Sequence, residues 1–195
     1  MVEVQHRLDE SSPELRRHRN IPHFLFNALN SVEALSRRAP GRIPELVRGL
    51  SKYLRYWLQP TQDGWATLQQ ELDAVASYLD VEKVRFEGQF EVEFEIAEVA
   101  RLQRVPQFFL QPLVENVLRE GIGTGPEPLR VVVSACCLDH RLRVEVRNTG
   151  GRSGMATALG GVLEDLRGRL DLLYNEDGYD WTDWLSLSIE IPLDA

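Results

Sequence analysis

Apolar residues recur at three- and four-residue steps in several stretches of the chain, a spacing that predicts amphipathic helices. The first predicted helix covers residues 22–38 and ends at an Ala-Pro-Gly sequence. A second follows over residues 44–58, where leucines recur every four residues. Because the link between them is short, the two helices should form a hairpin in which each covers the apolar stripe of the other.

The remaining predicted elements mix helices and strands. Residues 68–86 predict a helix with one apolar side and its carboxylates elsewhere, and the apolar-acidic alternation of residues 90–96 predicts a half-exposed strand. The next helix should begin near Pro106, bend or break at Pro112 and end at the glycines of residues 121–125. The other predicted elements are strands over 129–138 and 142–150 joined by a turn at 139–141, a glycine-rich loop over 150–161, a helix over 162–174 and a strand from 184.

This order of elements favours the α+β class. We expect an N-terminal helical hairpin followed by an α/β sandwich with helices on one face of a mixed sheet. A turn-rich break at residues 60–66 suggests where the chain divides, into a helical region over 1–62 and a second domain over 63–195.

Composition and charge narrow the classes of partner. Hydrophobic residues make up 43% of the chain and charged residues 27%, as in ordinary globular proteins. The formal net charge of −8 argues against nucleic acid as the main partner, because binding phosphate backbones needs a basic face. No apolar run is long enough to span a membrane, and the adjacent Cys136 and Cys137 suggest reduced thiols in a cytoplasmic protein.

A polar stripe runs along the first predicted helix. Steps of four and three residues from His23 reach Asn27 and Asn30, which places the three side chains on one helical face. Pro22 should start or kink the helix. The apolar residues of this helix mark a different face: Leu25, Leu29 and Val32, with Phe26 beside them. From the residues alone, His23 is either a hydrogen-bonded core histidine or a group used in chemistry.

Two further positions carry candidate chemistry. Glu115 and Asn116 stand side by side after an apolar run within a predicted helix. Asn148 precedes Gly150 by two residues at the end of a predicted strand, a pattern that by itself is a turn signal. Each also has an ordinary structural interpretation, as a solvent-facing helix side or a tight turn.

The sequence PHFLFNALNS of residues 22–31 resembles the phosphoacceptor box of the LytS-like sensor histidine kinase family, usually NPHFLFNALNS, with Ile21 replacing the first Asn. LSKYLRYWL and LQQELDAVASYLDVEKVRF are similar to the family patterns LSxLLRYxL and LxxELxxxxxYLxIExxRF. The resemblance covers nearly all of residues 19–193. It implies that the second domain is a GHKL-like ATP-binding domain and that His23 accepts phosphate from ATP.

The resemblance also implies roles for residues of the predicted nucleotide site. QPLVENVLREG, residues 111–121, is similar to the family's N box, QPLVENAIKHG. By this similarity Asn116 would hold the Mg²⁺ that bridges the ATP phosphates, Glu115 would orient or deprotonate the acceptor, and Arg119 keeps a positive charge where Lys is common. Asn148 takes the position of the adenine-binding Asp of GHKL domains.

The resemblance also implies roles for three glycines of the predicted nucleotide site. Gly150 would allow close approach of the base, and Gly160 and Gly161 belong to the loop that would cradle phosphates. The sequence departs from the family nearby. Residues that replace a glycine, an Asn and a His of the family patterns should weaken ATP binding: Val162, Asp165 and Glu120.

The expected function is a bacterial, cytoplasmic two-component histidine kinase core that phosphorylates His23 from Mg-ATP and passes the phosphate to an aspartate of a response-regulator receiver domain. The expected assembly is a homodimer through the N-terminal helices, with a possible sensor segment upstream of this chain. Two alternatives stay open. One is a histidine phosphotransferase or pseudokinase with impaired ATP binding, and the other is a non-catalytic dimeric regulatory module.

Overall fold

The computed structural model describes residues 20–58, 64–123, 125–148, 166, 168, 170–171, 180–182 and 186–192. The predicted glycine-rich loop over 150–161 lies outside these ranges. Most of the helix predicted over 162–174 does too, although its residues 166, 168, 170 and 171 are described and are helical. The side chains of residues 20–23, 180–182, 186–188 and 192 are not described, so that of His23 lies outside the described part.

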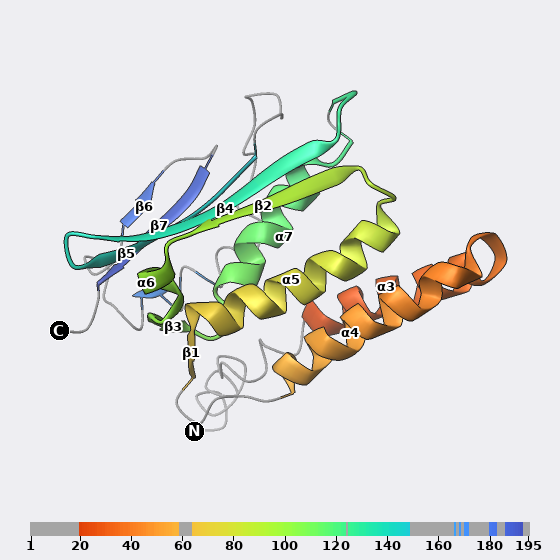
Figure 1. Cartoon of the computed structure of the whole chain (residues 1–195), viewed down its shortest axis with the longest axis horizontal. Coiled ribbons are helices and arrows are strands. Elements are labelled where there is room, and N and C mark those ends of the chain that lie inside the picture. The colour runs from red at the N-terminus through yellow and green to blue at the C-terminus, as the bar shows by residue number, and fades with distance from the viewer. Residues whose placement is uncertain are drawn as a thin grey trace, which may run out of the picture.

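The predicted helical hairpin is present. Helix α3 (Asn20–Arg38) and helix α4 (Ile43–Trp57) run side by side, joined through the short 3₁₀ helix η1 (Pro40–Arg42) (Figure 1). Pro22 is only the third residue of α3, where a missing N–H breaks no intrahelical bond, so the helix begins before the proline.

The buried face of α3 differs from the predicted apolar face. Phe24, Ala28 and Leu35 are buried, whereas Phe26 is 65% and Leu29 is 51% exposed. The helix carries two apolar stripes, and periodicity alone does not decide which one packs on its neighbours. The buried stripe is the one that lies against α4 and the following helix.

Five strands form one mixed sheet in the order β2-β4-β5-β7-β6, in which β2 and β4 are parallel and the other neighbours antiparallel. The predicted turn between the two long strands is formed by Asp139 and His140, both with positive φ, as a two-residue hairpin requires. The strands are β2 (Phe90–Ile96), β4 (Leu129–Leu138), β5 (Arg141–Asn148), β6 (Asp180–Thr182) and β7 (Ser186–Pro192). Of these, β6 was not predicted.

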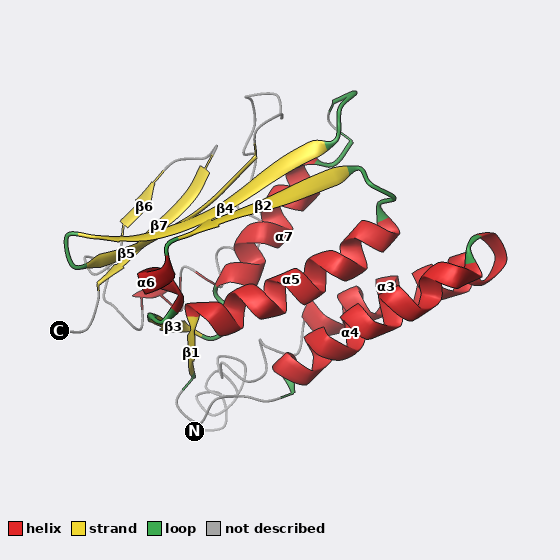
Figure 2. Ribbon diagram, viewed as in Figure 1, coloured by secondary structure: helices red, strands yellow, loops and turns green. Residues whose placement is uncertain are grey.

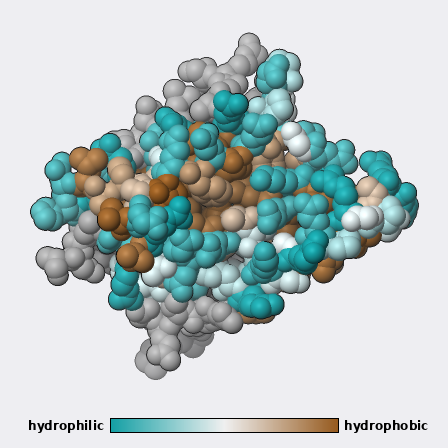
Figure 3. All heavy atoms as spheres, in the orientation of Figure 1, coloured by the Kyte–Doolittle hydropathy of each residue, from teal (hydrophilic) through white to brown (hydrophobic). Residues whose placement is uncertain are grey.

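Helices cover one face of the sheet, as predicted. The long helix α5 (Leu68–Arg85), the short α6 (Glu98–Arg101) and α7 (Leu110–Gly121) all lie on the same side (Figure 2). The hairpin packs on the side of α5 that faces away from the sheet (Figure 1). Buried apolar residues form one continuous core from the hairpin to the sheet. On the face shown in Figure 3, apolar residues gather between β2 and α5.

The prediction of a bent helix from Pro106 was wrong. Pro106 is instead the last residue of strand β3 (Arg104–Pro106), which pairs antiparallel with β1 (Trp65–Thr67). Helix α7 begins only at Leu110. Pro112 is the third residue of α7, so its missing N–H interrupts no hydrogen bond and the helix does not break there.

A second correction concerns the carboxylates of α5. Glu71 and Glu82 are only 1% and 2% exposed, although the amphipathic pattern predicted carboxylates away from the apolar side. Glu82 pairs with Arg85 one turn later on the same helix, at 2.5 Å. Glu71 bonds to other elements instead, as described below.

The described residues include no helix that is long and apolar enough to cross a membrane. Residues 59–63, within the predicted domain boundary, lie outside the described ranges. The division at residues 62 and 63 therefore stays a prediction.

Candidate functional site

Helix α7 carries three of the predicted site residues. Its apolar side packs into the core, and Glu115 and Asn116 are half-buried at the edge of that side. The Oδ1 atom of Asn116 accepts a hydrogen bond of 2.7 Å from Nη2 of Arg119, one turn later. Nε of Arg119 lies 3.3 Å from the carboxylate of Glu120. The guanidinium of Arg119 on α7 therefore contacts both an amide oxygen and a carboxylate.

Asn148 lies at the same end of the molecule as these residues. It follows the alternating buried residues Val144 and Val146 of β5, so it belongs to the sheet face that α7 covers. Its partner in the sheet, near the start of β4, is Val131. The end of α7 also contacts the start of β4, because a Cβ atom built on Gly121 would lie 2.5 Å from Cδ1 of Leu129. The structure thus brings the second half of α7 and the end of β5 together.

Glu115 lies on the side of α7 that faces the hairpin, because Gln111, one turn earlier, accepts a hydrogen bond from Tyr53 of α4. Burial is the main cause that raises the pKa of the Tyr53 and Tyr78 hydroxyls, and the charge of Glu115 raises both further. Tyr53 belongs to α4 and Tyr78 to α5. The carboxylate of Glu115 therefore lies close to residues of both helices.

The segment next to His23 packs on the same two tyrosines. The ring of Phe24 lies 4.8 Å from that of Tyr53 in an edge-to-face arrangement, and 5.1 Å from that of Tyr78. His23 itself belongs to the first turn of α3. The segment that contains His23 and the helix that bears Glu115 therefore both contact Tyr53.

The donor set suits a magnesium-bound nucleotide better than an all-protein metal site. Among the described residues, no three His, Cys, Asp or Glu side chains cluster as metal ligands. Mg²⁺ needs few protein ligands when phosphates and waters supply the rest, and the Asn116 amide oxygen already faces one cation, Arg119.

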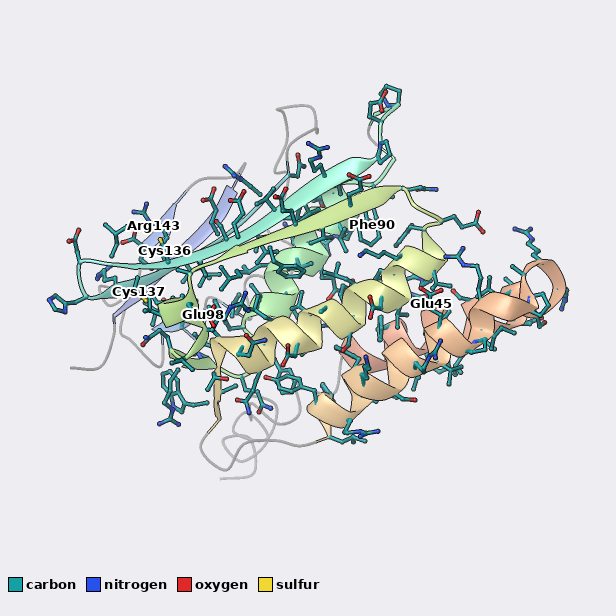
Figure 4. All side chains as sticks on the ribbon, viewed as in Figure 1. Glu45, Phe90, Glu98, Cys136, Cys137 and Arg143 are labelled. Carbon is teal, nitrogen blue, oxygen red and sulfur yellow. The ribbon has the colours of Figure 1, made fainter. Side chains whose placement is uncertain are left out.

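Cys136 and Cys137 are free thiols toward the opposite end of β4, with Arg143 on the neighbouring strand (Figure 4).

Three predicted nucleotide residues, Gly150, Gly160 and Gly161, lie outside the described residues, as do Val162 and Asp165. The side chain of His23 also lies outside the described part. The other predicted site residues form two groups: Asn116, Arg119 and Asn148 lie toward the second half of α7 and the end of β5, whereas Glu115 lies on the side of α7 that faces the hairpin.

No site role was predicted for Glu71, a buried residue that contacts the start of α7. Its Oε1 atom accepts bonds of 2.5 Å from the hydroxyl of Tyr56 and 2.6 Å from the amide of Phe108, and its Oε2 atom accepts one of 3.0 Å from the amide of Leu110. A signal was available, because Glu71 follows Leu68 by three residues and so lies on the apolar side of α5.

Comparisons with known proteins agree with this architecture. A profile of the family described as Histidine kinase matches residues 15–90. The sensor protein LytS of Enterococcus faecalis is 32% identical over 170 residues, which are 80% of this chain and 29% of that protein. The sensor histidine kinase BtsS of Escherichia coli K12 is 36% identical over 130 residues, or 67% of this chain and 23% of that protein.

A solved structure shows the same fold. The blue-light activated histidine kinase of Erythrobacter litoralis EL346 aligns with a TM-score of 0.51 and 18% identity, covering 91% of this chain and 63% of that one. The chain spans less than a third of the length of the two curated relatives. From the phosphoacceptor-like helix, the GHKL-like sheet and helices and these sequence matches, we conclude that the chain belongs to the LytS-like family of sensor histidine kinases.

Proposed function

We propose that this chain is the kinase core of a two-component system and that it transfers the γ-phosphoryl group of Mg-ATP to His23. The observation that carries the proposal is the shared aromatic cluster: Phe24, next to His23, contacts Tyr53, and the Tyr53 hydroxyl donates a hydrogen bond to Gln111 of α7. That contact links the phosphoacceptor segment to the helix that bears Asn116.

In the proposed reaction, the Nε2 lone pair of His23 forms a bond to the γ-phosphorus while the bond from that phosphorus to the bridging oxygen of ADP breaks. Glu115 would orient the imidazole or accept its proton. Asn116 would hold Mg²⁺, Arg119 would neutralise phosphate charge, and Asn148 would accept a hydrogen bond from the adenine amine. The residues of this site would thus act mainly by aligning the nucleotide with His23 and by neutralising phosphate charge.

The phosphoryl group would then pass from His23 to an aspartate of a response-regulator receiver domain. We further propose a homodimer through the N-terminal hairpin, a cytoplasmic location and a division into regions 1–62 and 63–195. Phe26 and Leu29, which are exposed on α3, are consistent with a helical dimer interface.

The test is to incubate the protein with γ-labelled ATP and Mg²⁺ and to map acid-labile label. We expect label on His23, none in His23→Ala, and none in Asn116→Ala, which should also lose the Mg-nucleotide-dependent rise in melting temperature. Gln89→Ala is the matched control, because it removes an exposed side-chain amide from the turn after α5.

Normal labelling of the His23→Ala variant would contradict the proposal. If the wild-type protein takes no label and nucleotide does not raise its melting temperature, the phosphotransferase or pseudokinase alternative is favoured instead. Wild-type binding of Mg-nucleotide by Asn116→Ala would contradict the proposed ligand role of that residue.

A further inference from the structure

Three elements meet at the carboxylate of Glu71. The carboxylate belongs to α5, and the Tyr56 hydroxyl that donates a hydrogen bond to it belongs to α4. Two backbone amides also donate to it: that of Leu110, the first residue of α7, and that of Phe108, two residues earlier. A single buried acceptor therefore joins the hairpin to the helix that bears Asn116.

The contact replaces a helix cap that the sequence near α7 lacks. The N-cap residue, Phe109, makes no side-chain capping bond, and Phe108 has a φ of 61°, an unusual conformation for a non-glycine residue. A carboxylate at a helix N-terminus satisfies free N–H groups and is favoured by the helix dipole. The start of α7 is thus held in place by a residue of another helix.

The protonation states support this geometry. Burial raises the pKa of the Tyr56 hydroxyl, and Glu71 raises it further, so Tyr56 keeps its proton and acts as the donor. Burial also raises the pKa of the Glu71 carboxyl, and the Tyr56 hydroxyl and the backbone amides counteract that rise. An ionised carboxylate has the acceptor sites that all these donors require.

A second contact runs parallel to the first. The hydroxyl of Tyr53 donates a bond of 2.7 Å to Oε1 of Gln111, in the first turn of α7. Gln111 precedes Glu115 by four residues and so lies on the same side of the helix. Tyr53 and Tyr56 are three residues apart on α4. The Tyr53 hydroxyl bonds to the first turn of α7 directly, and the Tyr56 hydroxyl bonds to Glu71, whose carboxylate caps that helix.

Building on the proposed function, we propose that Tyr56 and Glu71, assisted by Tyr53, are positioning residues that hold α7 at a fixed place relative to the phosphoacceptor helix. Tyr53 contacts Phe24 on one side and Gln111 on the other, so the hairpin and α7 share their contacts at this point. Neither Tyr56 nor Glu71 needs to touch nucleotide. Their effect is on the alignment of the nucleotide with His23.

The test is the Tyr56→Phe variant, which removes the donor but keeps the ring that packs edge-to-face on Phe108 at 5.5 Å. We expect the rate of His23 phosphorylation at saturating Mg-ATP to fall roughly tenfold, the lower end for a hydrogen bond to a charged group. The dissociation constant of Mg-ADP should change less than about twofold, because no nucleotide contact is lost. Tyr53→Phe should act in the same direction.

The matched control is Ser77→Ala. It also removes a hydroxyl from this core, but that hydroxyl bonds at 2.9 Å to the carbonyl of Asp73 within α5 itself. The control should leave the phosphorylation rate unchanged. An unchanged rate in Tyr56→Phe overturns the proposal, and so does a parallel loss of rate, nucleotide affinity and melting temperature, which would indicate a purely structural contact.

A second readout separates this inference from the proposed kinase activity. If the wild-type protein takes no phosphate, the amide hydrogen exchange of Phe108 and Leu110 decides the question. Exchange roughly ten times faster in Tyr56→Phe, but not in Ser77→Ala, supports the coupling of α4 to α7. Unchanged exchange at both amides overturns it.

Discussion

The amide oxygen of Asn116 accepts a hydrogen bond from Arg119, and the same oxygen is the one we propose for Mg²⁺. The guanidinium and a bound Mg²⁺ would repel each other at this distance, so Arg119 should leave Asn116 when the magnesium nucleotide binds. Arg119 then becomes available for a phosphate. Its contact with Glu120 lowers the net positive charge of this surface.

We predict that Glu120→Gln strengthens Mg-nucleotide binding, because it removes a negative charge next to the phosphate-binding guanidinium. Both side chains are about half exposed, so the effect should be modest, about two- to fivefold in the dissociation constant. Titration calorimetry at low salt would measure it. Glu93→Gln is the control, because it removes the same charge from an exposed position on β2. Weaker binding by Glu120→Gln would contradict the proposed role of Arg119.

Some of these single residues were predicted from the sequence and others were not. The motif resemblance predicted roles for Glu115, Asn116, Arg119 and Asn148, and these roles stay predictions. In the structure Asn116 and Arg119 contact each other on α7, and Asn148 ends β5. The family pattern LxxEL includes Glu71, but no role was predicted for this residue, because its partners lie 15, 37 and 39 positions away along the chain. A buried carboxylate in an apolar stripe is a signal, but its purpose depends on what packs against it.

Among the elements, α7 depends on close packing against β4. Gly121 ends the helix at a point where a Cβ atom would lie 2.5 Å from Cδ1 and 2.7 Å from Cδ2 of Leu129. Leu129 is itself buried and pairs with Phe90 in the sheet, which limits its freedom to move away. The glycine therefore permits the approach that places the end of α7 near Asn148.

We predict that Gly121→Ala lowers the free energy of unfolding by about 1–3 kcal/mol, the usual cost of overpacking a core. Urea denaturation would measure the change. Gly41→Ala is the matched control, since a Cβ atom there meets nothing within 4 Å, and it should alter stability by less than about 0.5 kcal/mol. Equal effects of the two substitutions would show that the contact with Leu129 does not limit this position.

The elements that sequence periodicity predicted best are the long ones with a clear pattern. The two hairpin helices, α5, β2 and the β4–β5 hairpin all form close to their predicted bounds. The short β1–β3 pair and α6 were missed, because strands of three residues and a helix of four carry too little periodic signal.

At the scale of the whole molecule, the hairpin and the sandwich share one core in the described residues. Three tyrosines lie where they meet: Tyr53, Tyr56 and Tyr78. Burial raises the pKa of all three hydroxyls, and nearby carboxylates raise them further. The stability of the contact between the hairpin and the sandwich should therefore depend on pH in the alkaline range.

We predict that stability falls as the pH rises above about 10, the ordinary pKa of tyrosine. The folded state holds these protons more tightly than the unfolded state, so their stabilising effect is complete below that pH and is lost progressively above it. Urea denaturation at increasing pH, with tyrosinate absorbance followed in parallel, would measure this.

The double variant Tyr53→Phe, Tyr56→Phe should show a shallower loss of stability with pH, because it lacks two of the titrating hydroxyls. Ionisation of all tyrosines near pH 10 while the protein stays folded would contradict the prediction.

The sequence by itself determined the long helices and strands and the family. Helix and strand periods, the turn at Asp139 and His140 and the phosphoacceptor-like motif all depend on residues that are near neighbours in the chain. Only the tertiary structure decided which stripe of α3 is buried, how the strands are ordered, and that Glu71 joins Tyr56 to the start of α7. These features depend on contacts between distant segments, which have no periodicity in the sequence because their free energy arises only when the segments pack together.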